Sequence, residues 1–155
     1  VMAFDTSSTM DAVASHMARS GYFPGGVQVG EFTSPPDATG TRLAGAIWMM
    51  NSSIVLLFAD GGTREVHTLM LRVYSDFKDP TSTGEKRLAL SVNQIASNIL
   101  SDSDLGATIM SVDAAGQYGT GMSMDWGQLT ISDRMYRVVD ITLPFIVDDA
   151  STATA

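Results

Sequence analysis

Two histidines, His16 and His67, are the side chains best suited to acid–base chemistry or metal binding near neutral pH. Neither has a second histidine, an aspartate or a glutamate at the spacing that metal ligands show. His16 falls on the polar side of a predicted helix, and His67 falls on a strand face with apolar neighbours. We therefore interpret both histidines as surface or packing residues rather than as parts of a reactive site.

Two pairs of neighbouring aspartates could also bind a cation: Asp102 with Asp104, and Asp148 with Asp149. A calcium loop needs several more oxygen ligands and a downstream glutamate, which neither pair has. The first pair follows the end of a predicted helix, and the second lies in a predicted C-terminal tail. We interpret both pairs as solvated surface.

Nucleophile and phosphate-binding motifs are missing from the sequence. It contains neither a Gly-x-Ser-x-Gly nucleophile elbow nor a Gly-x-x-x-x-Gly-Lys-Ser/Thr phosphate loop. The glycine-rich segment 116–121 follows a predicted strand but does not open a helix, so a dinucleotide site is not expected. We expect this segment to be a mobile loop that becomes ordered against a partner.

Composition favours a protein that works by association. The 155 residues, enough for one domain, are 45% hydrophobic and only 17% charged, so much of the surface must be apolar or neutral. Such a surface favours coverage by partner proteins. The absence of cysteine excludes disulfides and thiolate metal sites. We therefore expect no cofactor and no enzymatic activity.

Charge argues against nucleic-acid binding. The formal net charge is −8, and the eight aspartates after residue 100 are opposed only by Arg134 and Arg137. DNA-binding proteins cluster their lysines and arginines, whereas the nine basic residues here are scattered. DNA could pass such an acidic surface without binding to it. No run approaches 18 apolar residues and no signal-peptide pattern surrounds Asp5, so neither a membrane span nor a signal peptide is expected.

Hydrophobic periodicity predicts an α+β fold: a mainly antiparallel sheet with two α-helices packed on it. The helices are expected at 8–20 and 85–101. We expect a single domain, 1–148, followed by a flexible C-terminal tail, 149–155. Strands, joined mostly as hairpins, are expected at 27–32, 43–50, 63–74, 107–112, 126–131 and 135–147.

The predicted core consists of apolar residues that recur at helical or strand spacing. Pro144 lacks a backbone N–H, which predicts that the end of the last strand lies at a sheet edge. The predicted core residues are Val13, Met17, Trp48, Leu69, Leu71, Val73, Leu88, Val92, Ile95, Ile99, Val139, Ile141 and Leu143.

The apolar run 54–58 is the most unusual segment, because a turn signal at 59–62 follows it directly. This pattern predicts a long β-hairpin arm that a monomer would leave partly exposed. We therefore predict that the arm contacts a neighbouring subunit, and that the loop 116–124 forms a second interface. The predicted interface residues are Ile54, Val55, Leu56, Leu57, Phe58, Tyr118, Met122 and Met124.

Several short segments occur in a recognisable order across residues 43–150. They are Ala46-Ile47-Trp48, Leu71-Arg72-Val73-Tyr74, Leu105-Gly106, Val112-Asp113 with the following glycines, Met135-Tyr136-Arg137-Val138, Ile141-Thr142-Leu143-Pro144 and Val147-Asp148-Asp149. In this order the chain resembles the tail terminator, or tail completion, proteins of siphophages that infect actinobacteria. The run 54–58 departs from that pattern, in which a more polar segment with glycine and serine is expected.

The resemblance implies a virion structural protein that assembles in the host cytoplasm and resides at the tail–head junction. It would form a ring, usually of six copies, that ends tail-tube polymerisation. Its partners would be sister subunits, the tail tube protein and the head–tail connector (stopper) protein, and genomic DNA would pass through the lumen without specific binding. Alternatives are another head–tail joining or tail-tube protein and, more remotely, a small hydrolase using Asp125, Asp140 or His67.

Overall fold

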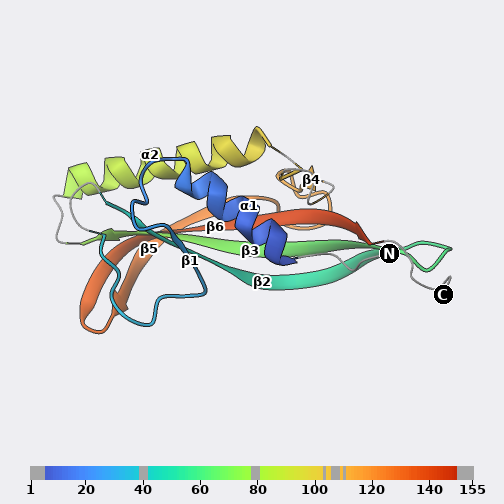
Figure 1. The fold of residues 1–155 in the computed structure, drawn as a ribbon, viewed down its shortest axis with the longest axis horizontal. Coiled ribbons are helices and arrows are strands. Elements are labelled where there is room, and N and C mark those ends of the chain that lie inside the picture. Colours follow the sequence, from blue (N-terminus) through green and yellow to red (C-terminus); the bar gives the residue numbers. More distant parts are fainter. Residues whose placement is uncertain are drawn as a thin grey trace.

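The computed structural model describes residues 6–38, 42–77, 81–102, 104–105, 109 and 111–149. Its described residues form two helices and a six-stranded, mostly antiparallel sheet, which confirms the predicted α+β class. Both helices lie over the same face of the sheet (Figure 1). The elements are α1 (Thr6–Ala18), β1 (Val27–Val29), β2 (Ala44–Leu57), β3 (Thr63–Asp76), α2 (Thr81–Leu100), β4 (Ser111–Val112), β5 (Ser123–Ile131) and β6 (Arg134–Asp149).

The sheet has the strand order β1-β2-β3-β6-β4, and β5 also pairs with β6. β6 is antiparallel to β3 from one end to the other. On its other side, β6 pairs first with β5 and then, towards its C-terminal end, with β4. β1 is parallel to β2 and pairs only with its first half, as far as Ile47. The strands that lie beside the central pair of β3 and β6 therefore change along the length of the sheet.

Each helix packs through one apolar stripe. α1 buries Val13 and Met17, one turn apart, and the chain leaves the helix at Gly21, whose φ of +83° suits a residue without Cβ. α2 buries Leu88, Val92 and the residues that continue this spacing. Both helices begin earlier than predicted, because polar first turns extend each helix beyond its apolar stripe.

The main core lies between the helices and the sheet. Every predicted core residue other than Trp48 is buried in this layer. Trp48 is only partly buried and lies on the opposite face of the sheet, where it packs against a second cluster that includes Tyr74 and Tyr136. The segment 30–38 crosses this face, and its Pro36 carbonyl accepts a hydrogen bond of 2.7 Å from the Tyr136 hydroxyl.

The prediction that Pro144 lies at a sheet edge is wrong. Pro144 is buried and pairs with Thr68 of β3, while its carbonyl accepts a bond of 2.9 Å from the Asp113 N–H on the other side. In an antiparallel strand the N and O of one residue face the same neighbour, so the Pro144 nitrogen also faces that side. On that side, the pairing of β6 with β5 ends at Thr142 and its pairing with β4 begins at Phe145. Pro144 lies between these two ladders, so no backbone donor is needed at its nitrogen.

The strand ends also differ from prediction. β2 continues through the apolar run to Leu57, whereas β1 is short and is followed by Gly30 at φ +94°. Asp148 and Asp149 belong to β6 instead of a solvated tail, and residues 150–155 lie outside the described part. The predicted strand 107–112 is described only as Ser111–Val112, since most of its other residues lie outside the described part.

A two-residue turn joins β5 to β6, as the sequence predicts. Ser132 and Asp133 have φ of +46° and +66°, the left-handed geometry of tight hairpin turns. We expect Asp133→Gly to raise the free energy of unfolding by roughly 0.5–1 kcal/mol, because glycine adopts this φ without a Cβ clash. Urea denaturation followed by circular dichroism measures the change. Asp133→Val should lower the midpoint, and equal midpoints for both variants would contradict the explanation.

Candidate subunit interface

The hairpin of β2 and β3 extends beyond both helices as an arm (Figure 1). Its tip is a turn in which the Phe58 N–H donates to the Gly62 carbonyl at 2.8 Å and the Gly61 N–H donates to the Phe58 carbonyl at 3.0 Å. The Asp60 carboxylate accepts from the Gly62 N–H at 2.9 Å. The structure thus has a hairpin with its tip at the predicted glycines.

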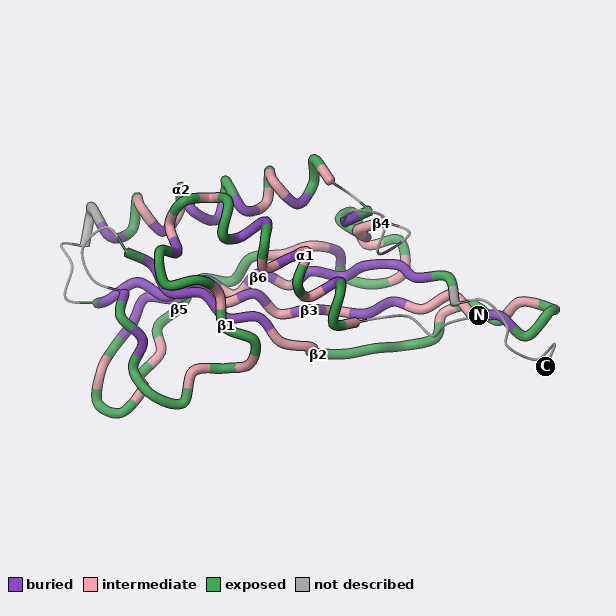
Figure 2. Tube along the Cα trace, viewed as in Figure 1, coloured by how far each residue is buried: buried purple, intermediate pink, exposed green. Residues whose placement is uncertain are grey.

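The outer side of the arm is an open strand edge. Among the described residues no strand pairs with β2 beyond Ile47 on the side away from β3. Residues 50–54 in this half of β2 are all exposed, and Figure 2 shows this part of β2 in green along the lower side of the sheet. An edge of this length leaves alternate N–H and C=O groups available to another strand.

Apolar side chains emerge from both faces of this edge. Register with β3 places Ile54 opposite Glu65 and Leu57 opposite Thr63, on the helix side of the sheet, where they are 65% and 72% exposed. Leu56 lies opposite Arg64 on the other face and is also exposed. Irregularities at Met50 and Val55 shift the register twice. The helices do not reach far enough to cover these side chains.

Arg64 anchors the arm to the rest of the molecule. Its guanidinium makes two hydrogen bonds to Asp148, of 2.7 and 2.9 Å, and a third of 3.1 Å to the Tyr118 hydroxyl. It also lies over the Phe58 ring, 5.7 Å from the ring centre. The bidentate pair lowers the pKa of Asp148 below its usual value. One cation thus connects the hairpin tip, β6 and the glycine-rich loop.

The glycine-rich loop is held by hydrogen bonds within the chain, and its predicted ordering against a partner stays a prediction. The buried Asp113 carboxylate accepts from the backbone N–H groups of Gln117 and Tyr118, at 2.7 and 3.1 Å. Gly116 adopts a φ of +79°, and a Cβ there would approach the Gly119 carbonyl to 2.6 Å. Met122, predicted as an interface residue, packs against the main core.

The second open edge is β5, which pairs only with β6 among the described residues. Met124, a predicted interface residue, is 36% exposed there. Trp126 is 52% exposed two residues later on the same face, and sequence reasoning did not single it out. The sequence did contain a signal for this exposure, because Trp126 lies in a mostly polar strand, and a polar strand is unlikely to be buried on both faces.

Two arginines of β3 on the face opposite the helices, Arg64 and Arg72, are held by carboxylates of β6. Arg72 donates to both oxygens of Asp140 at 2.6 and 3.0 Å, and it lies over the Trp48 ring at 5.0 Å. These bonds raise the pKa of Arg72. With the Arg64 pair, this places two cations on β3, each paired with a carboxylate of the adjacent strand β6. The face of the sheet opposite the helices therefore presents little uncompensated positive charge at Arg64 and Arg72.

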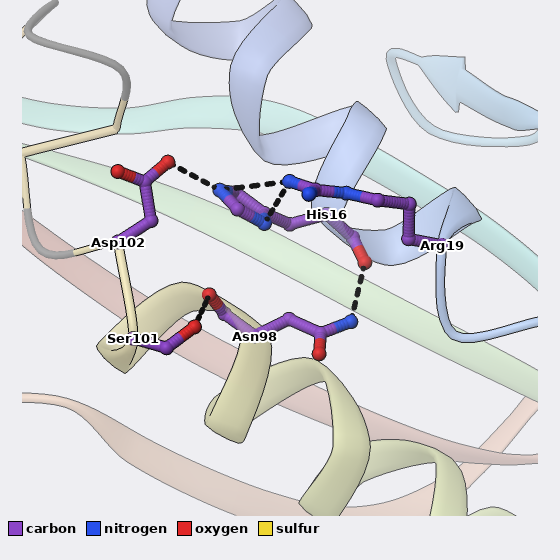
Figure 3. A network of polar contacts seen from close by, with 5 residues as sticks. All are labelled: His16, Arg19, Asn98, Ser101 and Asp102. Atoms are coloured by element: carbon purple, nitrogen blue, oxygen red, sulfur yellow. Dashed lines mark hydrogen bonds and ion pairs between the residues drawn. The ribbon is translucent and has the colours of Figure 1, made fainter.

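His16 is buried, which corrects its prediction as a polar-face residue. Figure 3 shows it at the ends of both helices, between Arg19 and Asp102. Its Nδ1 lies 2.6 Å from an Arg19 nitrogen, and its Nε2 lies 2.8 Å from an Asp102 oxygen. Since arginine can only donate, Nδ1 accepts and Nε2 donates to the carboxylate. Asn98 donates to the His16 carbonyl at 3.1 Å. Asp102 is thus a helix-to-helix partner rather than solvated surface.

His67 is a packing residue, as predicted, but it also belongs to a polar chain. It stacks on Phe145, Nδ1 lies 2.6 Å from the Ser52 hydroxyl, and Nε2 lies 3.2 Å from a Glu65 oxygen. The hydrolase alternative calls for a pocket that brings together two of Asp125, Asp140 and His67. Asp125 and Asp140 are cross-strand neighbours on the face of the sheet opposite His67, and Asp140 is bound to Arg72.

Two further site types are not found in the described part of the chain. No group of three or more histidine or carboxylate side chains there could hold a metal ion. Of the helices described, none is long and apolar enough to span a membrane.

Comparison with known proteins adds no assignment. No protein-family model and no curated protein matches the chain.

The Arg64–Asp148 pair predicts an acid-sensitive contribution to stability. Because the pKa of Asp148 is lowered in the folded state, its contribution is present at neutral pH and is lost as pH falls below the usual aspartate range. We expect Asp148→Asn to lower the urea midpoint at pH 7 by a small amount, with the difference from wild type shrinking towards pH 3. A constant difference across that range would contradict the assignment.

Proposed function

We propose that this chain is a virion structural protein, a tail terminator whose subunits assemble into a ring at the head-proximal end of a siphophage tail. The ring would end tube polymerisation and meet the head connector. The order of matching segments supports the family, and the exposed apolar arm supports assembly. The arm is the observation that carries the proposal, because its side chains have no cover within the described chain.

The physical driving force would be burial of the arm. Fully covering a leucine or isoleucine side chain contributes about 1.5–3 kcal/mol, before the costs of association. Ile54 and Leu57 are more than half exposed, so each retains most of that potential. Because the arm of one subunit would meet a different surface of the next, the contact is head-to-tail, and such contacts close into rings or grow into filaments.

The paired arginines fit a lumen through which DNA passes. If the helices face outwards, the opposite face of the sheet lines the ring, with Arg64 and Arg72 held by Asp148 and Asp140. A guanidinium already bound to two carboxylate oxygens has fewer N–H donors and less net positive charge available for a phosphate. The acidic net charge of the chain would further weaken contacts with the DNA backbone.

Assembly is tested by removing the two most exposed side chains of the arm. We expect the purified protein to have the mass of a ring, and Ile54→Ser with Leu57→Ser to shift it towards monomer while circular dichroism stays unchanged. Multi-angle light scattering measures the mass. Leu90→Ser is the control, because Leu90 is a 58% exposed leucine on α2 and not on the arm. A monomeric wild-type protein at all concentrations would refute ring formation.

Electron microscopy of the same sample separates the alternatives. A terminator should give discrete rings that cap tubes of the tail tube protein and block their elongation. A tail-tube protein should instead polymerise by itself. Rings that bind a connector but leave tube length unchanged would favour another head–tail joining protein.

Loss of a masking carboxylate should make the ring bind polyanions. We expect Asp140→Asn to leave Arg72 with only its longer ion pair of 3.7 Å to Glu31 and to raise the salt concentration needed for elution from heparin, whereas the wild-type protein should be retained weakly. Asp11→Asn changes the net charge equally on the exposed side of α1 and serves as control. Equal retention of the two variants would contradict arginine masking.

A further inference from the structure

The two open edges of the sheet differ in position. The first is the outer side of β2 beyond Ile47, and the second is the outer side of β5. Within one subunit, Trp126 of β5 is level with Gly45 of β2, through Val139 and Val73. The open part of β2 therefore lies further along the strand direction than β5 does. Two copies related by a two-fold axis would pair each edge with the same edge of the other copy. In a head-to-tail ring, one edge of each copy pairs with the other edge of the next copy.

Strand directions favour a match between unlike edges. β2, β3, β6 and β5 alternate in direction, because each neighbouring pair is antiparallel. β2 and β5 consequently run in opposite directions. A rotation about an axis near the strand direction keeps these directions, so β5 of one copy would meet β2 of the next as an antiparallel neighbour. Because the open part of β2 and the β5 edge are displaced from each other along the strands, the strands must tilt relative to the rotation axis. Strands in a closed sheet have such a tilt.

The exposed apolar side chains of the two edges have the same arrangement. Ile54 and Leu57 lie opposite Glu65 and Thr63, so they are one alternate-residue step apart on the helix side of the sheet. Met124 and Trp126 have the same separation, also on the helix side, since they lie opposite Ile141 and Val139 of the main core. This shared spacing selects a register.

We propose that the outer edge of β2 pairs antiparallel with the β5 edge of a neighbouring copy, with Ile54 beside Trp126 and Leu57 beside Met124. This inference specifies the subunit contact and rests on the proposed function. The same register places Ser53 beside Gly127 and Leu56 beside Asp125 on the opposite face. The β2 edge from 51 to 57 carries no charged residue, so no like charges oppose Asp125.

A hollow at the β5 edge provides room for the incoming side chains. It has a volume of about 210 Å³ and lies between β5 and the start of α2. Leu88 and Trp126 give it apolar walls, and Glu85, Gln128 and Arg137 are among its polar lining residues. An aliphatic side chain entering from the strand edge would contact Trp126 first. The register above brings Ile54 to this position.

Disulfide trapping tests the register without interference, because the chain contains no cysteine. We expect Ser53→Cys combined with Gly127→Cys to give, after mild oxidation, a ladder of covalent oligomers up to the full ring on a non-reducing gel. Directly opposed residues of antiparallel strands have Cα atoms close enough for a disulfide. A Cβ at Gly127 meets no atom within 4 Å, so the cysteine should be accommodated. Leu56→Cys with Asp125→Cys is a second pair that the same register predicts.

The matched control is Ser53→Cys with Gln128→Cys, which moves one cysteine by one residue to the other face of β5. It should cross-link at least tenfold more slowly than the proposed pair. If rings form by light scattering but neither proposed pair exceeds this control, the edge pairing is wrong and the proposed function stands. Efficient dimers from Ser53→Cys alone would show β2 pairing with itself and would also overturn the inference. Absence of any oligomer would refute the pairing together with ring formation.

Discussion

The sheet is longer than the two helices that cover it, and this mismatch governs the rest of the molecule. Over α1 and α2 the strands bury a continuous apolar layer, and on the opposite face the segment 30–38 covers the tyrosine cluster. Beyond the helices, the hairpin keeps its strand pairing but loses its cover (Figure 1). Backbone hydrogen bonds hold the arm in shape, while its apolar side chains remain in contact with water.

β6 makes this arrangement possible because it pairs on both sides. Its first half is flanked by β3 and β5, and its end is flanked by β3 and β4. Pro144 lies between the stretch of β6 that pairs with β5 and the stretch that pairs with β4, where its missing N–H removes no ladder hydrogen bond. Arg64 and Asp148 then fasten the far end of β3 to β6 and to the glycine-rich loop. The arm is consequently a stiff extension of the sheet rather than a loose hairpin, which lowers the entropic cost of docking it.

Polar networks serve this scaffold in different ways. His16 joins the ends of the two helices through Arg19 and Asp102, and Asn98 adds a bond to the His16 carbonyl (Figure 3). His67 instead sits within the arm, between Ser52 and Glu65 and against Phe145. Both imidazoles are engaged at both nitrogens, and these contacts fix the orientation of each ring.

Sequence periodicity by itself determined the fold class, both helices, the helix-facing core and the position of the hairpin tip, because these depend on local spacing and turn chemistry. The exposure of Ile54, Leu56 and Leu57 also followed from local composition, whereas Val55 and Phe58 are half-buried. Only the tertiary structure decided which polar residues meet: His16 with Asp102 and Arg64 with Asp148 are separated by more than eighty residues. Trp48 and Pro144 were misplaced for the same reason. Their environment depends on which strands lie beside them, and strand neighbours are set by long-range pairing that no local pattern encodes.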